Sequence, residues 1–401
     1  MLFSLLLSFL VAIEVVAQAQ TSQLVVLTGS SLPSSVPFGG GDLLPTGSQV
    51  SYRTYTATST IPSGSLSGAT ELLATTIAIA NGTSLPPSSG SGSTSSSRSV
   101  TILEGGQRGF PTTSGTNSST NATSSTSTAA QPVNTQACNN YPELCSRSYS
   151  NITYVAAHNS PFITPNNAAA NQKYGVFAQL NDGIRMLQGQ THFYDNTIYY
   201  CHTSCDLLNA GSAETYFANI TRWIQGHPFD VVTLLIGNAD FRAVTDYIAP
   251  LEDSGLSKYA YVPPKVPMNT TDWPTLSSMI LTGKRAVIFM DYNANQTAVP
   301  YILDEFSQIW ETPFSPTNSG FPCTIERPPG LSNEDAGTRM YMANHNLNTE
   351  INALGTSLLV PTTTLINETN AVNGTGSLGS MADECAGKIP QFCLLFVHDQ
   401  N

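Results

Sequence analysis

Basic side chains are scarce in this chain of 401 residues. Its 15 lysines and arginines are outnumbered by 27 aspartates and glutamates, so the formal net charge is −12. A surface that binds DNA or RNA normally needs an excess of positive charge, and we therefore expect no nucleic-acid partner. The cysteines have no Cys-x-x-Cys or His-x-x-x-His pair beside them, which argues against a zinc site. The apolar run from Leu2 to Ile13 is too short to span a bilayer, so we expect at most peripheral contact with membranes.

Residues 1–19 are typical of a secretory signal peptide. The apolar run is followed by Ala17-Gln18-Ala19, which has the small-x-small pattern of a signal peptidase site. Seven cysteines and a series of Asn-x-Ser/Thr sequons fit an oxidising, glycosylating compartment. We expect a secreted or extracellular protein, at the cell surface or in the cell wall, with glycans on several sequons. The sequons begin at Asn81, Asn117, Asn121, Asn151, Asn219, Asn269, Asn295, Asn367 and Asn373.

The seven cysteines predict three disulfides and one thiol left over. The spacing favours Cys138 with Cys145, Cys201 with Cys205, and Cys323 with Cys385, which leaves Cys393 as the odd cysteine. Other connectivities stay open, because six cysteines can be paired in many ways.

The composition changes near residue 136. Residues 20–136 are dominated by Ser, Thr, Gly and Pro, and such a segment buries too little apolar surface to offset the entropy of ordering its backbone. We expect a disordered, low-complexity stalk there, of a kind that carries O-linked sugars. Residues 137–401 contain Trp, Tyr, Phe and alternating apolar runs, and their number suits a single α/β barrel domain.

Within the folded part, apolar strands alternate with amphipathic helices. In 212–226, Phe217, Ile220 and Ile224 recur at the spacing of one helical face. The run 229–238 is apolar almost throughout, as in strands buried on both faces of a parallel sheet. Alternation of this kind predicts an α/β fold, a parallel sheet closed into a TIM-type barrel. Further strands are expected at 151–159, 184–190, 197–202 and 285–293, and further helices at 168–183, 240–255, 273–283 and 299–310.

Two histidines stand at the ends of predicted strands. His158 follows the first strand of the folded part, and His202 follows the strand 197–202. The active site of such a barrel lies at the carboxyl ends of its strands. Cleavage of a phosphodiester without a covalent enzyme intermediate needs one group that removes a proton and one that donates a proton, and two imidazoles supply both. The pair therefore predicts a phosphodiesterase.

The motifs around these histidines resemble a known family. The segments "AAHNSPF", "AQLNDGIRMLQGQTH", "CHTSCDLL", "HPFDVVTLLIGN", "GKRAVIFMDYNANQ" and "RMYMANHNLN" are similar, in this order, to the fungal secreted phospholipase-C-like phosphodiesterases of the phosphatidylinositol-specific phospholipase C X-domain superfamily. The likeness covers roughly residues 138 to 390. It implies a TIM-type barrel in which His158 is the general base on the inositol 2-hydroxyl and His202 is the general acid on the leaving group.

The chain departs from that family where the phosphate needs positive charge. The resemblance implies either an arginine or a Ca²⁺ ion held by an asparagine and carboxylates. Asn159 matches the asparagine, but Gln188 and Gln190 stand at the carboxylate or arginine positions, and Gly237 stands where another acidic ligand is expected. Neutral amides do not offset the dehydration of Ca²⁺, so we expect no resident metal or cofactor, and at most weak Ca²⁺ binding through Asn159, Gln188 and Gln190. These replacements put turnover in question.

Other side chains are candidates for binding the substrate. Arg185 and Lys284, or Arg285 beside it, are candidates to replace the missing cation. Asp291 and Tyr292 follow the strand 285–293 and are suited to hydrogen-bond a polyol. With Asn159, Gln188 and Gln190, these residues make up the predicted substrate site, while His345 is a further candidate to line the pocket.

The end of the chain also departs from the family. The run "IPQFCLLFVHDQN" starts an expected last strand and then stops, so the predicted barrel is incomplete at its C-terminus.

Three functions are compatible with these observations. The leading hypothesis is a phosphoric diester hydrolase of the phospholipase C type, which uses the histidine pair as acid and base and acts as a monomer on a phosphodiester lipid or a sugar phosphate. The second is a catalytically impaired surface or cell-wall protein that binds a sugar phosphate or glycolipid, as Gln188 and Gln190 suggest. The third is an enzyme similar to glycerophosphodiester phosphodiesterases, although "HNSPF" lacks the carboxylates that those enzymes place near the first histidine.

Overall fold

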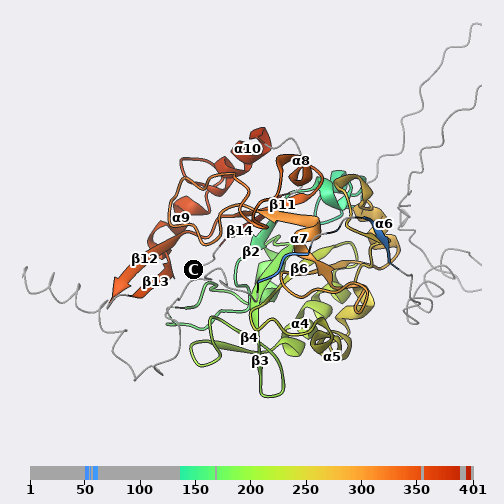
Figure 1. The fold of residues 1–401 in the computed structure, drawn as a ribbon, viewed down its shortest axis with the longest axis horizontal. Helices are drawn as coiled ribbons and strands as arrows, with labels where there is room; N and C mark the ends of the chain where they lie inside the picture. The colour runs from blue at the N-terminus through green and yellow to red at the C-terminus, as the bar shows by residue number, and fades with distance from the viewer. Residues whose placement is uncertain are drawn as a thin grey trace, which may run out of the picture. The chain divides into compact units, whose positions relative to one another are not determined.

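The computed structural model describes residues 50–53, 55, 57–61, 136–167, 169–353, 356–388 and 394–398. Within this part of the chain, a parallel sheet runs in the order β10-β11-β14-β2-β3-β6-β8-β9, and β4 and β5 extend it beside β3. Figure 1 shows β11, β14 and β2 side by side in the middle of the fold. The predicted signal peptide, most of the predicted stalk and Cys393 lie outside the described residues.

The strands of this sheet include all those that the apolar runs predict. Parallel neighbours are in register over most of their length, for example Gln190 opposite Gly237 in β3 and β6. The strands are β2 (Tyr154–Ala157), β3 (Met186–Tyr194), β4 (Thr197–Cys201), β5 (Asn209–Ser212), β6 (Val232–Asn238), β8 (Ala286–Met290), β9 (Leu303–Asp304), β10 (Ile309–Glu311), β11 (Met340–Asn344) and β14 (Leu394–His398). Two antiparallel pairs stand apart from it: β1 (Ser59–Thr60) with β7 (Lys265–Val266), and β12 (Asn348–Ala353) with β13 (Thr356–Pro361).

Alternate side chains of the strands face two different cores. In β6, Leu235 joins the cluster enclosed by the strands, whereas Leu234 and Ile236 join the cluster between strands and helices. β3 alternates in the same way, with Met186 inside and Leu187 outside. Because side chains of a strand repeat every two residues, the face of β3 that carries Met186 also carries Gln188 and Gln190.

The long helix α4 (Ala213–Gly226) matches its prediction. Ser212 begins it, because the Ser212 hydroxyl accepts a hydrogen bond from the Thr215 amide at 3.3 Å, which satisfies one free N–H of the first turn. Phe217, Ile220 and Ile224 are buried against the sheet. The other α-helices are α3 (Val176–Asn181), α5 (Ile248–Asp253), α6 (Leu276–Leu281), α7 (Glu305–Gln308), α8 (Asn333–Ala336), α9 (Ile366–Thr369) and α10 (Leu378–Lys388). Among the described residues, no helix is both long and apolar enough to cross a membrane.

The helix predicted at 299–310 is wrong. This stretch contains β9, the short helix α7 and β10, and its residues from 301 to 310 are all buried. A continuously buried segment has no polar face, so its periodicity does not distinguish a helix from strands.

The described barrel is open at this place rather than at its C-terminus. β14 pairs with both β11 and β2, so the last strand is in the sheet. Hydrogen bonding between strands instead stops between β9 and β10, where α7 joins them. The TIM-type prediction is therefore right for the parallel strands, whereas the sheet of the described residues does not close.

The three predicted disulfides are present. They join Cys138 to Cys145, Cys201 to Cys205, and Cys323 to Cys385. The second of them closes the turn that begins at His202, so it holds that loop beside the end of β4.

Residues 50–61 were predicted to belong to a disordered stalk, and here the structure corrects the prediction. β1 pairs with β7, and Ile61 is 6% exposed. Figure 1 shows this segment, in blue, passing close to α7.

Candidate active site

The two predicted catalytic histidines converge on one side chain. His158 follows β2, and His202 follows β4. The side-chain amide nitrogen of Asn159, Nδ2, lies 3.2 Å from Nε2 of His158 and 3.3 Å from Nε2 of His202. The two ring nitrogens are therefore within two hydrogen-bond lengths of each other, on one side of the fold. Their exposed fractions are 5% for His158 and 1% for His202, so a substrate has to reach a largely enclosed pair.

Each part of this site is held by its neighbours. Nδ1 of His202 lies 2.7 Å from the carbonyl oxygen of Ala169, which indicates that Nδ1 carries a hydrogen and leaves Nε2 to face Asn159. The ring of Phe162 stacks on that of His202 with 5.0 Å between centroids. Gln172 donates a hydrogen bond of 2.6 Å to the carbonyl oxygen of His158. These contacts hold the ring of His202 and the backbone of His158 before any substrate binds.

Gln188 and Gln190 lie beside the histidines but hold loops rather than an ion. The Gln188 side-chain oxygen accepts a hydrogen bond from the Asn159 backbone amide at 2.8 Å. The Gln190 oxygen accepts one from the Thr203 amide, also at 2.8 Å. Thr203 has a φ of 61°, which is costly for a β-branched residue, so Gln190 stabilises a strained turn directly after His202.

This donor set does not fit Ca²⁺. Both glutamine oxygens are already bonded to backbone amides, and a Ca²⁺ site needs several oxygen ligands with carboxylate charge. A side chain at Gly237 would also approach the Cα of Gln190 to 3.3 Å, so the backbone of β3 crowds that position. Among the described residues, no three His, Cys, Asp or Glu side chains gather to hold a metal ion.

The cations predicted to replace the metal are in the wrong place. Arg185 precedes β3, and Lys284 and Arg285 precede β8, so all three lie at the amino ends of parallel strands. His158 instead follows the carboxyl end of β2, and His202 follows β4, which pairs antiparallel with the carboxyl half of β3. Arg185 is paired with Asp230 at 2.8 Å, and Lys284 donates to the Lys258 carbonyl. The prediction that Arg185 and Lys284 bind the substrate is therefore wrong.

Replacement of Arg185 should separate stability from activity. Arg185→Met leaves Asp230, which is 8% exposed, without its partner, and breaking a buried pair in this way costs about 3 kcal/mol. We expect a lower thermal midpoint, measured by calorimetry, and an unchanged kcat/KM, measured by hydrolysis of a fluorogenic inositol phosphodiester. A large fall in kcat/KM at a temperature where the variant is folded would contradict this placement.

Asp291 and Tyr292 do lie at the carboxyl end of β8. Oδ1 of Asp291 accepts hydrogen bonds from the amides of Asn238 and Tyr292 at 2.8 and 2.7 Å. The hydroxyl of Tyr292 accepts a hydrogen bond of 2.7 Å from Arg327. Although part of Asp291 stays accessible, burial raises its pKa to about 6.

A buried charged cluster surrounds Arg327, and no sequence motif predicts it. Arg327 pairs with Glu311 at 2.9 Å, and their side chains are 5% and 1% exposed. The buried carboxyl of Glu305 lies close enough to Glu311 for burial and the Glu311 charge to raise its pKa well above the usual range. Nothing in the spacing of these residues marks them as neighbours, because Arg327 reaches Glu311 from a separate loop.

Two buried carboxyls make stability depend on pH. Burial raises the pKa of Asp304, like that of Asp291, to about 6. The folded state then keeps protons that the unfolded chain releases near pH 4, so these groups favour folding at low pH and lose that contribution as pH rises to about 6. We expect Asp304→Asn to gain on the order of 2 kcal/mol relative to the native chain between about pH 4 and pH 7, measured by urea unfolding. A difference that is independent of pH would contradict the raised pKa.

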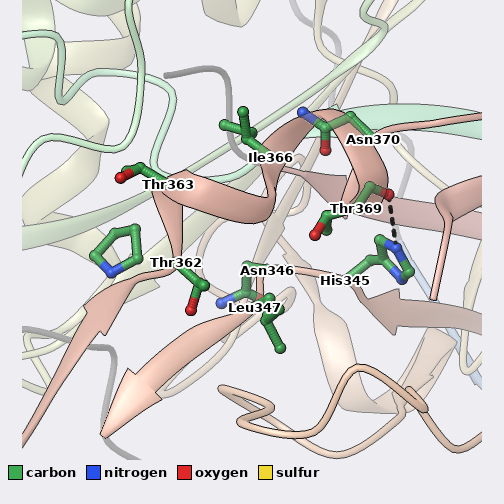
Figure 2. Close-up of a pocket in the computed structure, with 9 residues that line it drawn as sticks. His345, Asn346, Leu347, Thr362, Thr363, Ile366, Thr369 and Asn370 are labelled. Carbon is green, nitrogen blue, oxygen red and sulfur yellow. Dashed lines mark hydrogen bonds between the residues drawn. The ribbon is translucent and has the colours of Figure 1, made fainter. Parts of the chain in front are cut away.

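His345 lies away from the histidine pair. It follows β11, and its Nε2 lies 3.0 Å from the carbonyl oxygen of Thr369 (Figure 2). The pocket that it lines is small, about 10 Å³, and is bounded by Asn346, Leu347 and the segment that begins α9. His345 therefore packs within the C-terminal region, where its ring is also 3.7 Å from that of Phe321.

Comparison with known proteins identifies the family. A family model described as "PI-PLC X 1" matches residues 144–399. The chain is 50% identical over 374 residues to an "Uncharacterized secreted protein" of Arthroderma benhamiae, covering 92% of this chain and 79% of that protein. It is 42% identical over 251 residues to "PI-PLC X domain-containing protein 1" of the same fungus, covering 62% and 79%. The chain therefore belongs to the PI-PLC X domain family.

A plant protein and bacterial structures are more distantly similar. "PI-PLC X domain-containing protein At5g67130" of Arabidopsis thaliana is 26% identical over 130 residues, which is 31% of this chain and 30% of that protein. Among solved structures, a double mutant of the Phosphatidylinositol-Specific Phospholipase C from S. aureus matches with a TM-score of 0.41 and 12% identity, over 63% of this chain and 87% of that one.

Proposed function

We propose that this protein is a secreted phosphoric diester hydrolase of the phospholipase C type. The observation that supports it most directly is the convergence of both histidine Nε2 atoms on the Asn159 amide. The substrate would be an inositol lipid or a related sugar phosphodiester. Secretion is supported by the three disulfides and by the similar protein named as secreted, and location at the cell surface or cell wall belongs to the same proposal.

The proposed reaction uses the two rings in turn. His158 takes the proton of the attacking hydroxyl, whose oxygen forms a bond to phosphorus. The bond from phosphorus to the leaving oxygen breaks, and His202, which in this step carries a proton on Nε2 as well as on Nδ1, gives the Nε2 proton to that oxygen. When the attacking hydroxyl belongs to the substrate itself, the product is a cyclic phosphodiester. Asn159 lies between the rings, and one N–H of its side-chain amide, the other being bonded to Asn171 at 3.1 Å, would donate to a phosphate oxygen.

Asp291 and Tyr292 are proposed to bind the polyol. They follow β8 at the same edge of the sheet as the histidines, and their oxygens already belong to a hydrogen-bonded network. Gln188 and Gln190 accept hydrogen bonds from backbone amides of the loops that follow the two histidines, so their contribution to binding is indirect.

A second candidate is a binding protein without turnover. The low exposure of His202, 1%, and the neutral amides around the pair favour it. Such a protein would bind inositol phosphates or a glycolipid through the same residues and release no product.

The test uses the full secreted chain. Phosphatidylinositol vesicles and a fluorogenic inositol phosphodiester are incubated with the protein, and ³¹P NMR follows the appearance of a cyclic phosphate. Turnover in the presence of a chelator supports the histidine mechanism. Binding of inositol phosphate by calorimetry, with no product under any divalent ion, favours the second candidate.

A further inference from the structure

The described residues of the segment 50–61, which are 50–53, 55 and 57–61, lie against the part of the barrel where the sheet is open. Its β1 end is held by β7: Ser59 is opposite Val266, Thr60 is opposite Lys265, and the Ile61 amide donates to the Pro264 carbonyl at 2.9 Å. In the chain, α6 lies between β7 and β8, and the backbone amide of Met268, just beyond β7, donates to the Gln308 side chain in α7 at 3.0 Å.

The other end of the segment contacts the residues that flank the opening. The ring of Tyr52 meets that of Phe306 in α7 edge-on, with 4.8 Å between centroids, and that of Tyr292 at 6.1 Å. The hydroxyl of Tyr55 hydrogen-bonds the carboxyl of Asp304 in β9, and burial together with that carboxylate raises the pKa of Tyr55. The segment thus contacts the end of β8, β9 and α7. No hydrogen bonds between strands connect β9 to β10 in the described sheet.

These contacts continue into the proposed polyol side of the site. Tyr292 accepts a hydrogen bond from Arg327, and the Arg327 guanidinium lies 4.8 Å from the Phe306 ring centroid. Arg327 in turn pairs with Glu311 at the end of β10, and the Asn344 amide at the end of β11 donates to the same carboxylate at 3.2 Å. Tyr52 therefore packs on the two rings that hold Arg327 in place.

We propose that residues 50–61 form a strap that closes the open side of the barrel and positions Tyr292 and Arg327 for the substrate. Tyr52 is then a positioning residue that lies outside the family match at 144–399. The role in substrate binding rests on the proposed function, whereas the docking of the strap does not. A stretch of the Ser/Thr-rich region would in this way be part of the working enzyme.

The docking is tested by a cysteine trap in the full chain, in a Cys393→Ser background. Thr60→Cys with Lys265→Cys places two thiols directly opposite each other in the β1–β7 pair, at a spacing that a disulfide spans. Peptide mass spectrometry without reduction should find the new bridge in most molecules. The control pair, Thr60→Cys with Lys258→Cys, should not form one, because Lys258 is exposed and has no β1 residue opposite it. Equal yields for both pairs would overturn the docking.

The positioning role is tested by kinetics. Tyr52→Ala removes the edge-on contacts with Phe306 and Tyr292, and we expect KM for the inositol phosphodiester to rise about tenfold with kcat within about twofold. Tyr141→Ala, at an exposed tyrosine of the folded domain, should leave both constants unchanged. Tyr55→Phe should raise KM in the same direction, because it loosens the strap at Asp304 without touching Tyr292.

Two results would overturn the positioning role. In the first, Tyr52→Ala lowers the thermal midpoint and leaves KM and kcat unchanged, so that the strap only stabilises the fold. In the second, the trapped disulfide form turns over more slowly than its reduced form, so that the strap blocks the site. If the native chain hydrolyses no phosphodiester, the proposed function fails. The positioning role is then tested by calorimetry with myo-inositol phosphate, and we expect Tyr52→Ala to raise the Kd about tenfold.

Discussion

His158→Ala should lower kcat about 10²- to 10⁴-fold, because it removes the group that takes the proton of the attacking hydroxyl. We expect the same loss on a natural lipid and on a substrate with an acidic phenol as leaving group, since both need an activated nucleophile. His202→Ala should differ. Its loss should be large on the lipid and small on the phenol ester, because a phenolate leaves without a proton. Steady-state kinetics on the two substrates separate the base from the acid.

His227→Gln is the matched control for these variants. His227 ends α4, stacks on Trp223 with 3.8 Å between ring centroids, and bonds the Trp223 carbonyl, so it lies at the helix end away from the paired histidines. Its replacement should leave kcat/KM on both substrates unchanged. If His158→Ala kept full activity on either substrate while folded, the proposed mechanism would be abandoned.

The parts of the fold that could be predicted are those with local signals. The apolar run of β6 and the helical face of α4 show in the sequence, and the three disulfides follow from spacing. The convergence of His158 and His202 could be anticipated only in part, because His158 follows the parallel strand β2, whereas His202 follows β4, which runs antiparallel to β3 beside its carboxyl half. Their common contact with Asn159 could not be predicted from the sequence, because it depends on the left-handed backbone conformation of Asn159, with a φ of 50°.

The position of the three predicted cations follows from strand direction. Arg185, Lys284 and Arg285 come before their strands, and in a parallel sheet that position alone puts them at the edge opposite the histidines. The direction of the strands, and not the alternation of side chains along them, therefore predicts at which edge of the sheet these basic residues lie. The Arg327 cluster and the strap are different, because each depends on contacts between segments far apart in the chain and leaves no periodic trace.

Arg327→Met should be the most destabilising single replacement among the charged residues considered. Arg327 is paired with Glu311, which is 1% exposed, and also donates to Tyr292. Removal of one partner leaves a buried charge without its counter-charge, at a cost of about 3 to 5 kcal/mol. For a domain of this size, we expect the thermal midpoint to fall by roughly 10 °C, measured by scanning calorimetry.

The double variant Arg327→Met/Glu311→Gln tells whether charge is the cause. It removes the unpaired carboxylate as well, and a buried ion pair replaced by neutral groups of similar volume is often close to neutral in stability. We expect the double variant to regain more than half of the lost thermal midpoint, although Glu311→Gln alone should also destabilise because it leaves Arg327 unpaired. If the two single losses simply add in the double variant, the pair is not coupled, and packing of the Arg327 side chain between Phe306 and Phe314 would be the main contribution.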